Sequence, residues 1–373
     1  MRCDPHLLHF GSIKRALMST MRAFRLFHGA ALRKVARVGG SFSAGIVARW
    51  WWVNTTVFAE SDSSATSATP SELMPPPRLA TRPPPLTNNK KVFSTVFKPY
   101  VLGEIIPMTH DVALFRFLLP TEEDEFNLKP CSTLQAQFKT GNAAVEQCQR
   151  FYTPVSANGT KGFFDLIVKR KPKGRMTDHL FGLHVGDTLN FRAVVFKVQY
   201  WPNRWQHVGM IAGGTGFTPM LQVIRHALTE PLDANGVPDR TKLSFLYCNR
   251  TEKHILLKGL FDDLARRFPE RFRVKYAVDS LVNKQKPFDG FVGYVTEEMA
   301  RDLMPPPGNG ENIVLVCGPD KLLNHVAGFP MGSGHTMSGS LALQPVAPDI
   351  ANLAQIGGVL GRLGYDAANV YKF

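Results

Sequence analysis

The chain has 373 residues, which is long enough for two domains with separate cores. An apolar content of 44% and a charged content of 20% are those of an ordinary globular protein. The net charge of +14 is unusual, and the five scattered cysteines (Cys3, Cys131, Cys148, Cys248 and Cys317) include no CxxC pair, so neither a disulfide framework nor a zinc site is indicated.

Much of the positive charge lies in residues 1–59, which hold nine of the 44 basic residues but only one of the 30 acidic residues. An arginine-rich, acid-poor start is typical of a mitochondrial targeting segment. We therefore expect a mitochondrial protein, at the outer membrane or in the intermembrane space. A solvated basic tail and a nucleic-acid-binding arm remain alternatives, although our interpretation includes no nucleic-acid partner.

Two further segments precede the predicted folded part. Residues 42–59 are moderately apolar and contain Trp50, Trp51 and Trp52, but Arg49 interrupts them. A spanning helix needs about 20 mostly apolar residues, so this stretch is either a membrane anchor or a segment resting at the headgroup boundary. Residues 60–89 are rich in serine and proline, which predicts a linker.

Residues 90–200 contain short, turn-bounded segments rich in β-forming residues. Examples are Val112–Leu119, Phe163–Lys169 and Thr188–Val194. No long helical period interrupts them, so this part predicts an antiparallel barrel or sandwich.

Residues 201–373 alternate predicted strands with predicted helices. The strands are Val208–Ala212, Lys242–Cys248, Arg273–Val278 and Asn312–Cys317, and the helices are Met220–Ala227 and Leu256–Arg267. This alternation predicts a doubly wound parallel sheet.

Ligands of such sheets bind beyond the carboxyl ends of the strands. Gly213-Gly-Thr-Gly-Phe-Thr-Pro219 follows the first strand, and its glycines allow the backbone to approach a pyrophosphate closely. We expect Thr218 to cap the next helix and Pro219 to begin it. A glycine turn that serves only as a tight connection is the alternative.

Two segments of the first half could bind anions. Arg150-Phe-Tyr-Thr-Pro-Val-Ser156 offers a cation for bidentate phosphate binding and an aromatic ring for a planar partner. Gly174-Arg-Met-Thr177 offers backbone amides and a hydroxyl at a predicted helix start. Each segment taken alone could equally be a solvated strand or loop.

Together with Cys317-Gly-Pro319, these motifs occur in the order found in ferredoxin reductase-like flavoenzymes, which the chain resembles. Thr251-Glu-Lys-His-Ile-Leu-Leu257 and Gly290–Met299 are similar to the NADH–cytochrome b5 reductases in particular. The ending, from Gly357 to Phe373, resembles the mitochondrial, fungal-type branch. The resemblance implies a six-stranded Greek-key barrel that binds FAD over residues 90–200 and an NADH-binding α/β domain over 201–373.

The resemblance also implies roles for individual residues. Arg150 would hold the FAD pyrophosphate, Thr121 would contact flavin N5, and Asp279 would bind the adenosine ribose and favour NADH over NADPH. Cys317 would lie beside the nicotinamide, although a small buried residue ending a strand is the alternative. The predicted catalytic set consists of Thr121, Lys169 and Cys317. The other expected cofactor contacts are Phe151, Tyr152, Thr153, Ser156, Val168, Lys169, Gly174, Arg175, Met176, Thr177, Gly213, Gly214, Thr215, Gly216, Thr218, Gly318 and Pro319.

The implied chemistry is hydride transfer from nicotinamide C4 to flavin N5, followed by single-electron release to cytochrome b5 or a similar acidic haem protein. No acid–base dyad is needed, and we expect a monomer without a metal. The run Lys169, Arg170, Lys171, Lys173 and Arg175 would steer such a partner, or it is only a solvated face. A quinone or another acceptor, and a non-catalytic nucleotide-binding module, are the alternative functions.

Several positions depart from the family pattern. Phe151 stands where the family has proline, Lys171 where it has tyrosine, and Thr177 where it has serine. Cys131-Ser-Thr133 replaces the usual Gly-Gln-His. Residues 330–352 form an insertion with no assigned function.

Overall fold

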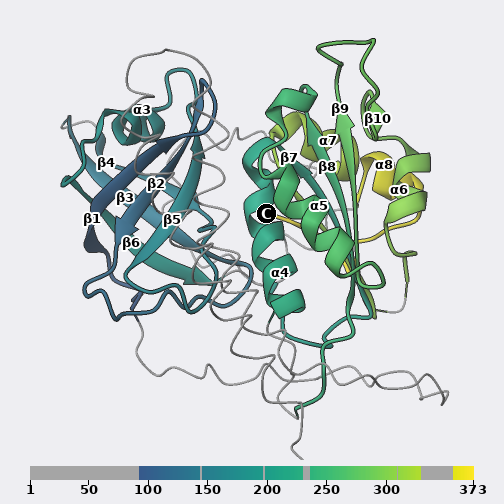
Figure 1. The fold of residues 1–373 in the computed structure, drawn as a ribbon, viewed down its shortest axis with the longest axis horizontal. Helices are drawn as coiled ribbons and strands as arrows, with labels where there is room; N and C mark the ends of the chain where they lie inside the picture. The colour runs from purple at the N-terminus through teal and green to yellow at the C-terminus, as the bar shows by residue number, and fades with distance from the viewer. Residues whose placement is uncertain (1–91, 143–144, 196–197, 230–235, 309, 329–355) are drawn as a thin grey trace, which may run out of the picture. The chain divides into compact units, whose positions relative to one another are not determined.

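The computed structural model describes residues 92–142, 145–195, 198–229, 236–308, 310–328 and 356–373 (Figure 1). Residues 1–59, the linker 60–89 and the insertion 330–352 lie outside these ranges, so the expectations for them are not addressed by the fold. Two six-stranded sheets form the framework of the described chain.

The first sheet is antiparallel, and its strand order is not that of the sequence. Neighbouring strands follow the order β4-β3-β6-β1-β2-β5, so chain neighbours and sheet neighbours differ, as in a Greek key. The strands are β1 (Lys98–Pro107), β2 (Val112–Leu118), β3 (Ser132–Asn142), β4 (Val145–Tyr152), β5 (Phe163–Lys169) and β6 (Thr188–Val195). The predicted antiparallel β domain is thus confirmed.

The sheet is closed by the segment that follows β4. The backbone N–H of Val155 donates to the carbonyl of Asp165 on β5 at 2.9 Å, which joins the two ends of the strand order. Alternate residues of each strand point inward. Tyr100, Phe117, Phe164 and Phe191 form an aromatic centre with edge-to-face contacts. This aromatic interior fills the barrel.

The second sheet is parallel, with the order β10-β9-β8-β7-β11-β12. Its strands are β7 (His207–Gly213), β8 (Lys242–Asn249), β9 (Phe272–Val278), β10 (Phe291–Val292), β11 (Asn312–Cys317) and β12 (Val370–Lys372). The chain moves outward from β7 to β10 and then returns to the other side at β11. A topological switch point therefore lies between β7 and β11, where ligands of such sheets bind.

Helices cover both faces of the parallel sheet. α4 (Phe217–Thr229) and α5 (Lys258–Arg267) pack on the face that carries Met210, Phe245 and Leu315. α6 (Glu297–Leu303), α7 (Asp320–Ala327) and α8 (Gly358–Arg362) pack on the face that carries Ile211 and Leu246. Adjacent residues of one strand thus enter different cores, which explains why the strands read as continuous apolar runs. The doubly wound sheet is confirmed.

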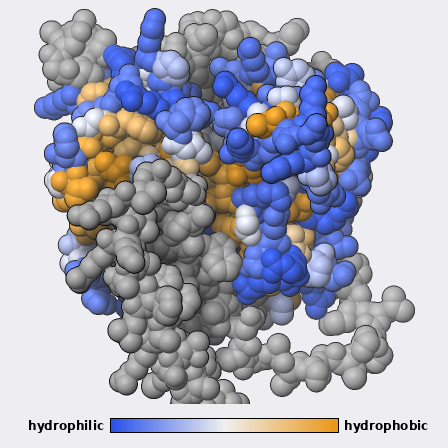
Figure 2. All heavy atoms as spheres, turned by 45° about the horizontal axis from the view of Figure 1, so that its top comes forward, coloured by the Kyte–Doolittle hydropathy of each residue, from blue (hydrophilic) through white to orange (hydrophobic). Residues whose placement is uncertain are grey.

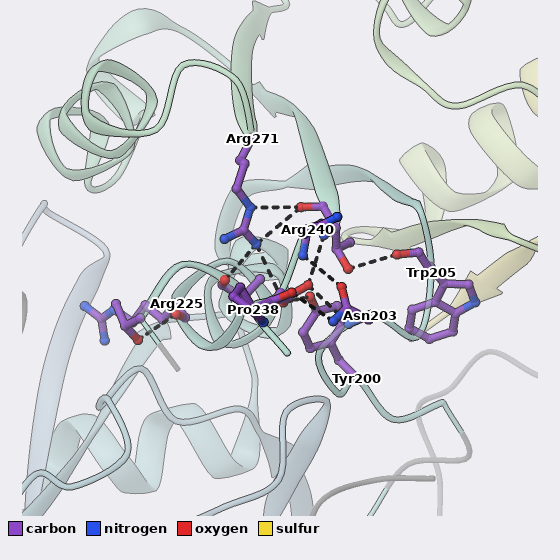
Figure 3. A network of polar contacts seen from close by, with 11 residues as sticks. Tyr200, Asn203, Trp205, Arg225, Pro238, Arg240 and Arg271 are labelled. Atoms are coloured by element: carbon purple, nitrogen blue, oxygen red, sulfur yellow. Dashed lines mark hydrogen bonds and ion pairs between the residues drawn. The ribbon is translucent and has the colours of Figure 1, made fainter. Parts of the chain in front are cut away.

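A buried carboxylate fixes the segment that enters the parallel sheet from the barrel. Asp239 Oδ1 accepts hydrogen bonds from the N–H groups of Asn203 (3.2 Å) and Thr241 (2.9 Å), and Oδ2 accepts one from the Tyr200 hydroxyl. Arg271, at the top of the network in Figure 3, places its Nη2 3.6 Å from Oδ2 of the same carboxylate. These bonds hold the segment that precedes β7 against the segment that precedes β8.

The outer surface combines polar and apolar residues. Figure 2 shows hydrophilic residues over much of one face, with hydrophobic residues gathered at its left side and near its centre. Within the described residues, no helix is both long enough and apolar enough to cross a membrane.

Candidate functional site

The glycine turn after β7 packs against the end of β11. A Cβ atom on Gly216 would lie 2.6 Å from the carbonyl oxygen of Cys317, and one on Gly213 would lie 3.0 Å from Pro319 Cδ. Gly214 has a φ of +53°, and a Cβ there would meet nothing within 4 Å. Gly213 and Gly216 are therefore needed for close packing, whereas Gly214 opens the backbone of the turn to a ligand.

The predicted helix cap at Thr218 is wrong. A 3₁₀ turn, η2 (Gly214–Gly216), leads directly into α4 at Phe217, so Thr218 and Pro219 are the second and third residues of the helix. The Thr218 hydroxyl donates to the carbonyl of Thr215 at 3.2 Å instead of accepting from the helix. The glycines allow the helix to begin earlier than the capping pattern suggested.

Polar residues occupy the ends of the two neighbouring strands. Asp279 follows β9, is exposed, and donates its N–H to the carbonyl of Asn249 at 3.0 Å. Asn249, at the end of β8, is buried, and its Nδ2 has no hydrogen-bond partner among the described residues. A buried unsatisfied amide is costly, and here it lies on the edge at which a nucleotide would bind.

The Arg150–Ser156 segment combines an exposed cation with a half-buried aromatic ring. Arg150 Nη1 donates to the carbonyl of Gln149 at 2.6 Å, and no carboxylate of the described chain pairs with Arg150. Tyr152 packs against the barrel core, and burial raises its pKa far above the usual value. Phe151 is 56% exposed, and Thr153 is half-buried. The guanidinium charge of Arg150 is thus available to a phosphate.

Ser156 has a structural partner within the barrel. Its hydroxyl accepts a hydrogen bond from the N–H of Asp165 at 2.8 Å. The fully buried Asp165 carboxylate in turn forms two bonds with Arg116, Nε–Oδ1 at 2.9 Å and Nη2–Oδ2 at 3.0 Å. This bidentate pair fixes β5 against β2, and the bonds of Val155 and Ser156 to Asp165 hold the segment against β5.

The helix start predicted at Gly174–Thr177 is confirmed, because α3 (Arg175–Gly182) begins there. The Thr177 hydroxyl bonds internally, donating to the Gly174 carbonyl at 2.9 Å and accepting from Lys171 N–H at 3.2 Å. The side chains of Met176 and Val168 are buried in the barrel core, whereas Arg175 is exposed. Met176 and Val168 thus present only their backbone groups to a ligand.

Lys169, at the end of β5, forms an ion pair with Asp111 in the loop between β1 and β2. The Nζ–Oδ2 distance is 3.1 Å. Partial burial by itself would raise the pKa of Asp111, but the hydrogen bonds from Lys169 and Thr109 and the charge of Lys169 lower it below its ordinary value. The Lys169 ammonium is therefore held in a defined position.

Thr121 is not brought next to Lys169, another residue of the predicted catalytic set. It lies in the exposed loop after β2 and shares a turn with Asp124, whose carboxylate accepts from Thr121 N–H at 3.0 Å. In the β2–β5 pairing, Lys169 is opposite Val112, whereas the Thr121 end lies beside Gly162. Because β2 and β5 have seven residues each, the two ends of this strand pair are about 20 Å apart. Thr121 and Lys169 therefore lie at opposite ends of the β2–β5 pair.

Cys317 ends β11; its side chain is half-buried, and its backbone carbonyl lies against Gly216 of the glycine turn. Burial raises the pKa of its thiol to about 12. The group is therefore a neutral thiol at ordinary pH, suited to packing against a ring and not to nucleophilic attack. The residues of the two halves also meet, because β5 lies against η2.

Three residues at this site (Arg225, Gln222 and His110) were not predicted from the sequence, whereas Arg250 belongs to the polar segment that follows the second predicted parallel strand. Arg225 and Gln222 of α4 donate to the carbonyls of Val155 and Pro154, respectively. His110 and Arg250 line a pocket beside Lys169. A solvated basic or polar residue has no distinctive spacing, so only Arg225, which falls on the apolar face of a helical pattern, carried a usable signal.

Two family models match the chain in the same order as the two sheets. The oxidoreductase FAD-binding domain matches residues 99–200, and the oxidoreductase NAD-binding domain matches residues 210–328. The first range covers the barrel strands, and the second covers the glycine turn, Asp279 and Cys317.

Curated relatives align over most of the chain. NADH-cytochrome b5 reductase 2 of Saccharomyces cerevisiae is 33% identical over 272 residues, covering 73% of this chain and 81% of the relative. The protein of the same name in Aspergillus terreus is 34% identical over 273 residues, covering 73% and 76%. NADH-cytochrome b5 reductase 1 of Aspergillus fumigatus is 36% identical over 242 residues, covering 65% and 76%.

Solved structures share the arrangement of both sheets. The cytochrome b5 reductase domain of Ulva prolifera nitrate reductase superposes with a TM-score of 0.55 at 31% identity, covering 63% of this chain and 92% of that domain. The CS and b5R domains of human Ncb5or in the NAD⁺ form give a TM-score of 0.53 at 18% identity, covering 74% and 69%. The second likeness supports the fold alone.

Proposed function

The chain belongs to the NADH–cytochrome b5 reductase family, and on that premise we propose that it carries electrons from NADH through FAD to cytochrome b5. The family relationship makes it an oxidoreductase with FAD- and NAD-binding domains. The observation that carries the assignment to this chain is the meeting of β5 with the glycine turn η2, which brings the two cofactor domains together at that turn.

The residues present fit FAD at the barrel. Arg150 offers an exposed guanidinium without a carboxylate partner, Tyr152 offers a half-buried ring, and α3 offers the free N–H groups of a helix start. Bound FAD would supply the chemistry that converts a two-electron hydride donor into two single-electron steps. The chain therefore needs to bind the cofactors, orient their reacting rings and shield them from water. No proton-transfer group is required.

The residues also fit NADH at the edge of the parallel sheet. Gly214 opens the backbone of the turn, the buried Asn249 lies at the end of β8, and Asp279 is exposed beside it. We assign Asp279 to the adenosine ribose, where its charge would repel a 2′-phosphate. The neutral Cys317 thiol would pack beside the nicotinamide and exclude water from the reacting atoms.

An acidic haem protein fits the basic run after β5. Lys169 and Arg170 pair with Asp111 and Asp178, at 3.1 Å and 3.2 Å. Lys171, Lys173 and Arg175 are exposed, and no carboxylate of the described chain pairs with them. These three charges are therefore free to attract a negatively charged partner, which supports cytochrome b5 over a neutral quinone as acceptor.

We further propose that the protein is mitochondrial and monomeric, with residues 42–59 attaching it to a membrane. The arginine-rich start and the tryptophan triplet support this proposal. Fractionation of cells that make the full chain, with and without residues 1–59, would test it. A protein that stays in the cytosolic fraction in both cases would contradict it.

The full-length protein tests the proposed function directly. Its visible spectrum should contain flavin bands that bleach rapidly when NADH is added without oxygen and slowly with NADPH. Subsequent addition of oxidised cytochrome b5 should restore the bands. A colourless protein that cannot take up FAD would instead favour a nucleotide-binding module, and bleached flavin that reoxidises only with a quinone would change the acceptor.

A further inference from the structure

The strand order fixes the path that a dinucleotide follows across the parallel sheet. Asp279 follows β9 and Cys317 ends β11, while β8 and β7 lie between them. Neighbouring strands are about 4.8 Å apart, so the two residues stand roughly 14 Å apart along the edge. With the adenosine at Asp279 and the nicotinamide at Cys317, the diphosphate of NADH crosses the ends of β8 and β7.

Arg250 occupies this crossing point. It directly follows β8, and its backbone carbonyl accepts a hydrogen bond from Ser280 N–H at 3.1 Å. This bond places Arg250 beside the Asp279–Ser280 pair on the neighbouring strand. Its side chain is exposed and pairs with no carboxylate of the described chain.

A pocket of about 410 Å³ opens between Arg250 and the barrel. Its lining residues are His110, Asp111, Lys169, Arg170, Pro172 and Arg250. Such a volume falls within the range of about 300–1,000 Å³ that is usual for small-molecule sites. Three cations and one carboxylate give the lining a positive balance, which favours an anionic ligand.

The pocket is held together by contacts between its two sides. The His110 ring lies edge-to-face against His254, with centroids 6.4 Å apart, and His254 Nδ1 is 2.8 Å from the Thr251 hydroxyl. The barrel loop is thus fixed next to the segment that follows Arg250. Of the three cations, Lys169 and Arg170 already have carboxylate partners, so Arg250 retains the unneutralised charge.

We propose that Arg250 binds the diphosphate of NADH in this pocket, an inference that rests on the proposed use of NADH. Its guanidinium can form two parallel hydrogen bonds with phosphate oxygens. Because it lines a pocket with Lys169 of the barrel, we assign it to the diphosphate, and a contact with a 2′-phosphate is the alternative that the test separates. It touches no reacting atom, so it affects binding and not the hydride step.

The test compares full-length Arg250→Gln and Arg250→Lys with the unaltered protein. Loss of a charge-assisted bidentate contact should raise the KM for NADH about tenfold or more with little change in kcat. The affinity for ADP-ribose, which has the diphosphate but no nicotinamide, should fall by a similar factor, whereas adenosine binding should not change. Arg250→Lys should recover part of both losses. Arg266→Gln removes an equal charge from the opposite end of α5 and should leave NADH binding unchanged.

Two results would overturn the inference. One is an unchanged KM for NADH and an unchanged ADP-ribose affinity in Arg250→Gln. The other is a loss confined to NADPH, which would assign Arg250 to the 2′-phosphate. Failure of the proposed function would look different, because NADH would then not bleach the flavin of the unaltered protein, and ADP-ribose titration would still report on Arg250.

Discussion

The guanidinium of Arg225 on α4 donates a hydrogen bond to the backbone carbonyl of Val155 in the barrel segment that begins at Arg150. Arg225 is only 4% exposed, and burial lowers its pKa to about 10, partly offset by the charge of Asp165. It therefore remains charged at neutral pH. Because α4 begins at the glycine turn, this bond connects the nicotinamide domain to the flavin-binding segment.

We expect Arg225→Met to weaken flavin retention. The substitution fills a similar volume but leaves the Val155 carbonyl unpaired, which costs roughly 1–3 kcal/mol. FAD should dissociate faster on dilution, as followed by flavin fluorescence. Gln222→Met removes a longer bond of 3.3 Å to the neighbouring Pro154 carbonyl and should have a smaller effect. Equal FAD retention in the unaltered protein and both variants would show that the bonds from α4 do not position the flavin-binding segment.

His207 should make the protein less stable as the pH falls. Burial lowers the pKa of His207 to about 4, and the charges of Lys242 and Arg273 act in the same direction. The unfolded chain takes up a proton near pH 6.5, so between about pH 6.5 and pH 4 the unfolded state binds more protons and folding stability is lost. His207→Gln should retain a polar contact with Ser244 and lose less Tm between pH 7 and pH 5. An identical loss of Tm in both proteins would contradict this account.

Cys317 should act as a neutral group. Since burial raises its thiol pKa to about 12, the rate of flavin reduction by NADH should show no titration due to Cys317 between pH 6 and pH 9. Iodoacetamide should alkylate it slowly at pH 8, because only the thiolate reacts. A pH step that is present in the unaltered protein and absent in Cys317→Ser would show that a thiolate takes part.

Removal of residues 329–355 should leave the reductase domain intact. Gly357 N–H donates to the Ala327 carbonyl at 3.0 Å, and a Cβ on Gly328 would lie 2.8 Å from Gly357 Cα, so the two ends are already in contact. A short glycine-serine linker closes such a gap at low entropic cost. We expect a Tm within a few degrees of the unaltered protein and normal flavin bleaching with NADH. Loss of FAD from the shortened protein would assign this segment a structural role.

Local pattern in the sequence was sufficient for much of the fold and for several site elements. The short, turn-bounded segment Val112–Leu118 is rich in β-forming residues, and β7, β8, β9 and β11 are apolar runs. Both features are properties of the segment itself. The glycine turn and the start of α3 at Arg175 likewise follow from nearby residues. The helix cap predicted at Thr218 was wrong, because the glycines before it form a 3₁₀ turn that leads directly into the helix at Phe217.

The sequence by itself determined the two sheets, their order along the chain and the residues that follow each parallel strand, because short-range periodicity and turn chemistry specify these features. Only the tertiary structure decided which of those residues meet. It placed Thr121 at the far end of the β2–β5 pair from Lys169, and it brought His110 next to the segment after Arg250. Such meetings depend on strand register and on packing between distant segments, which no local pattern contains.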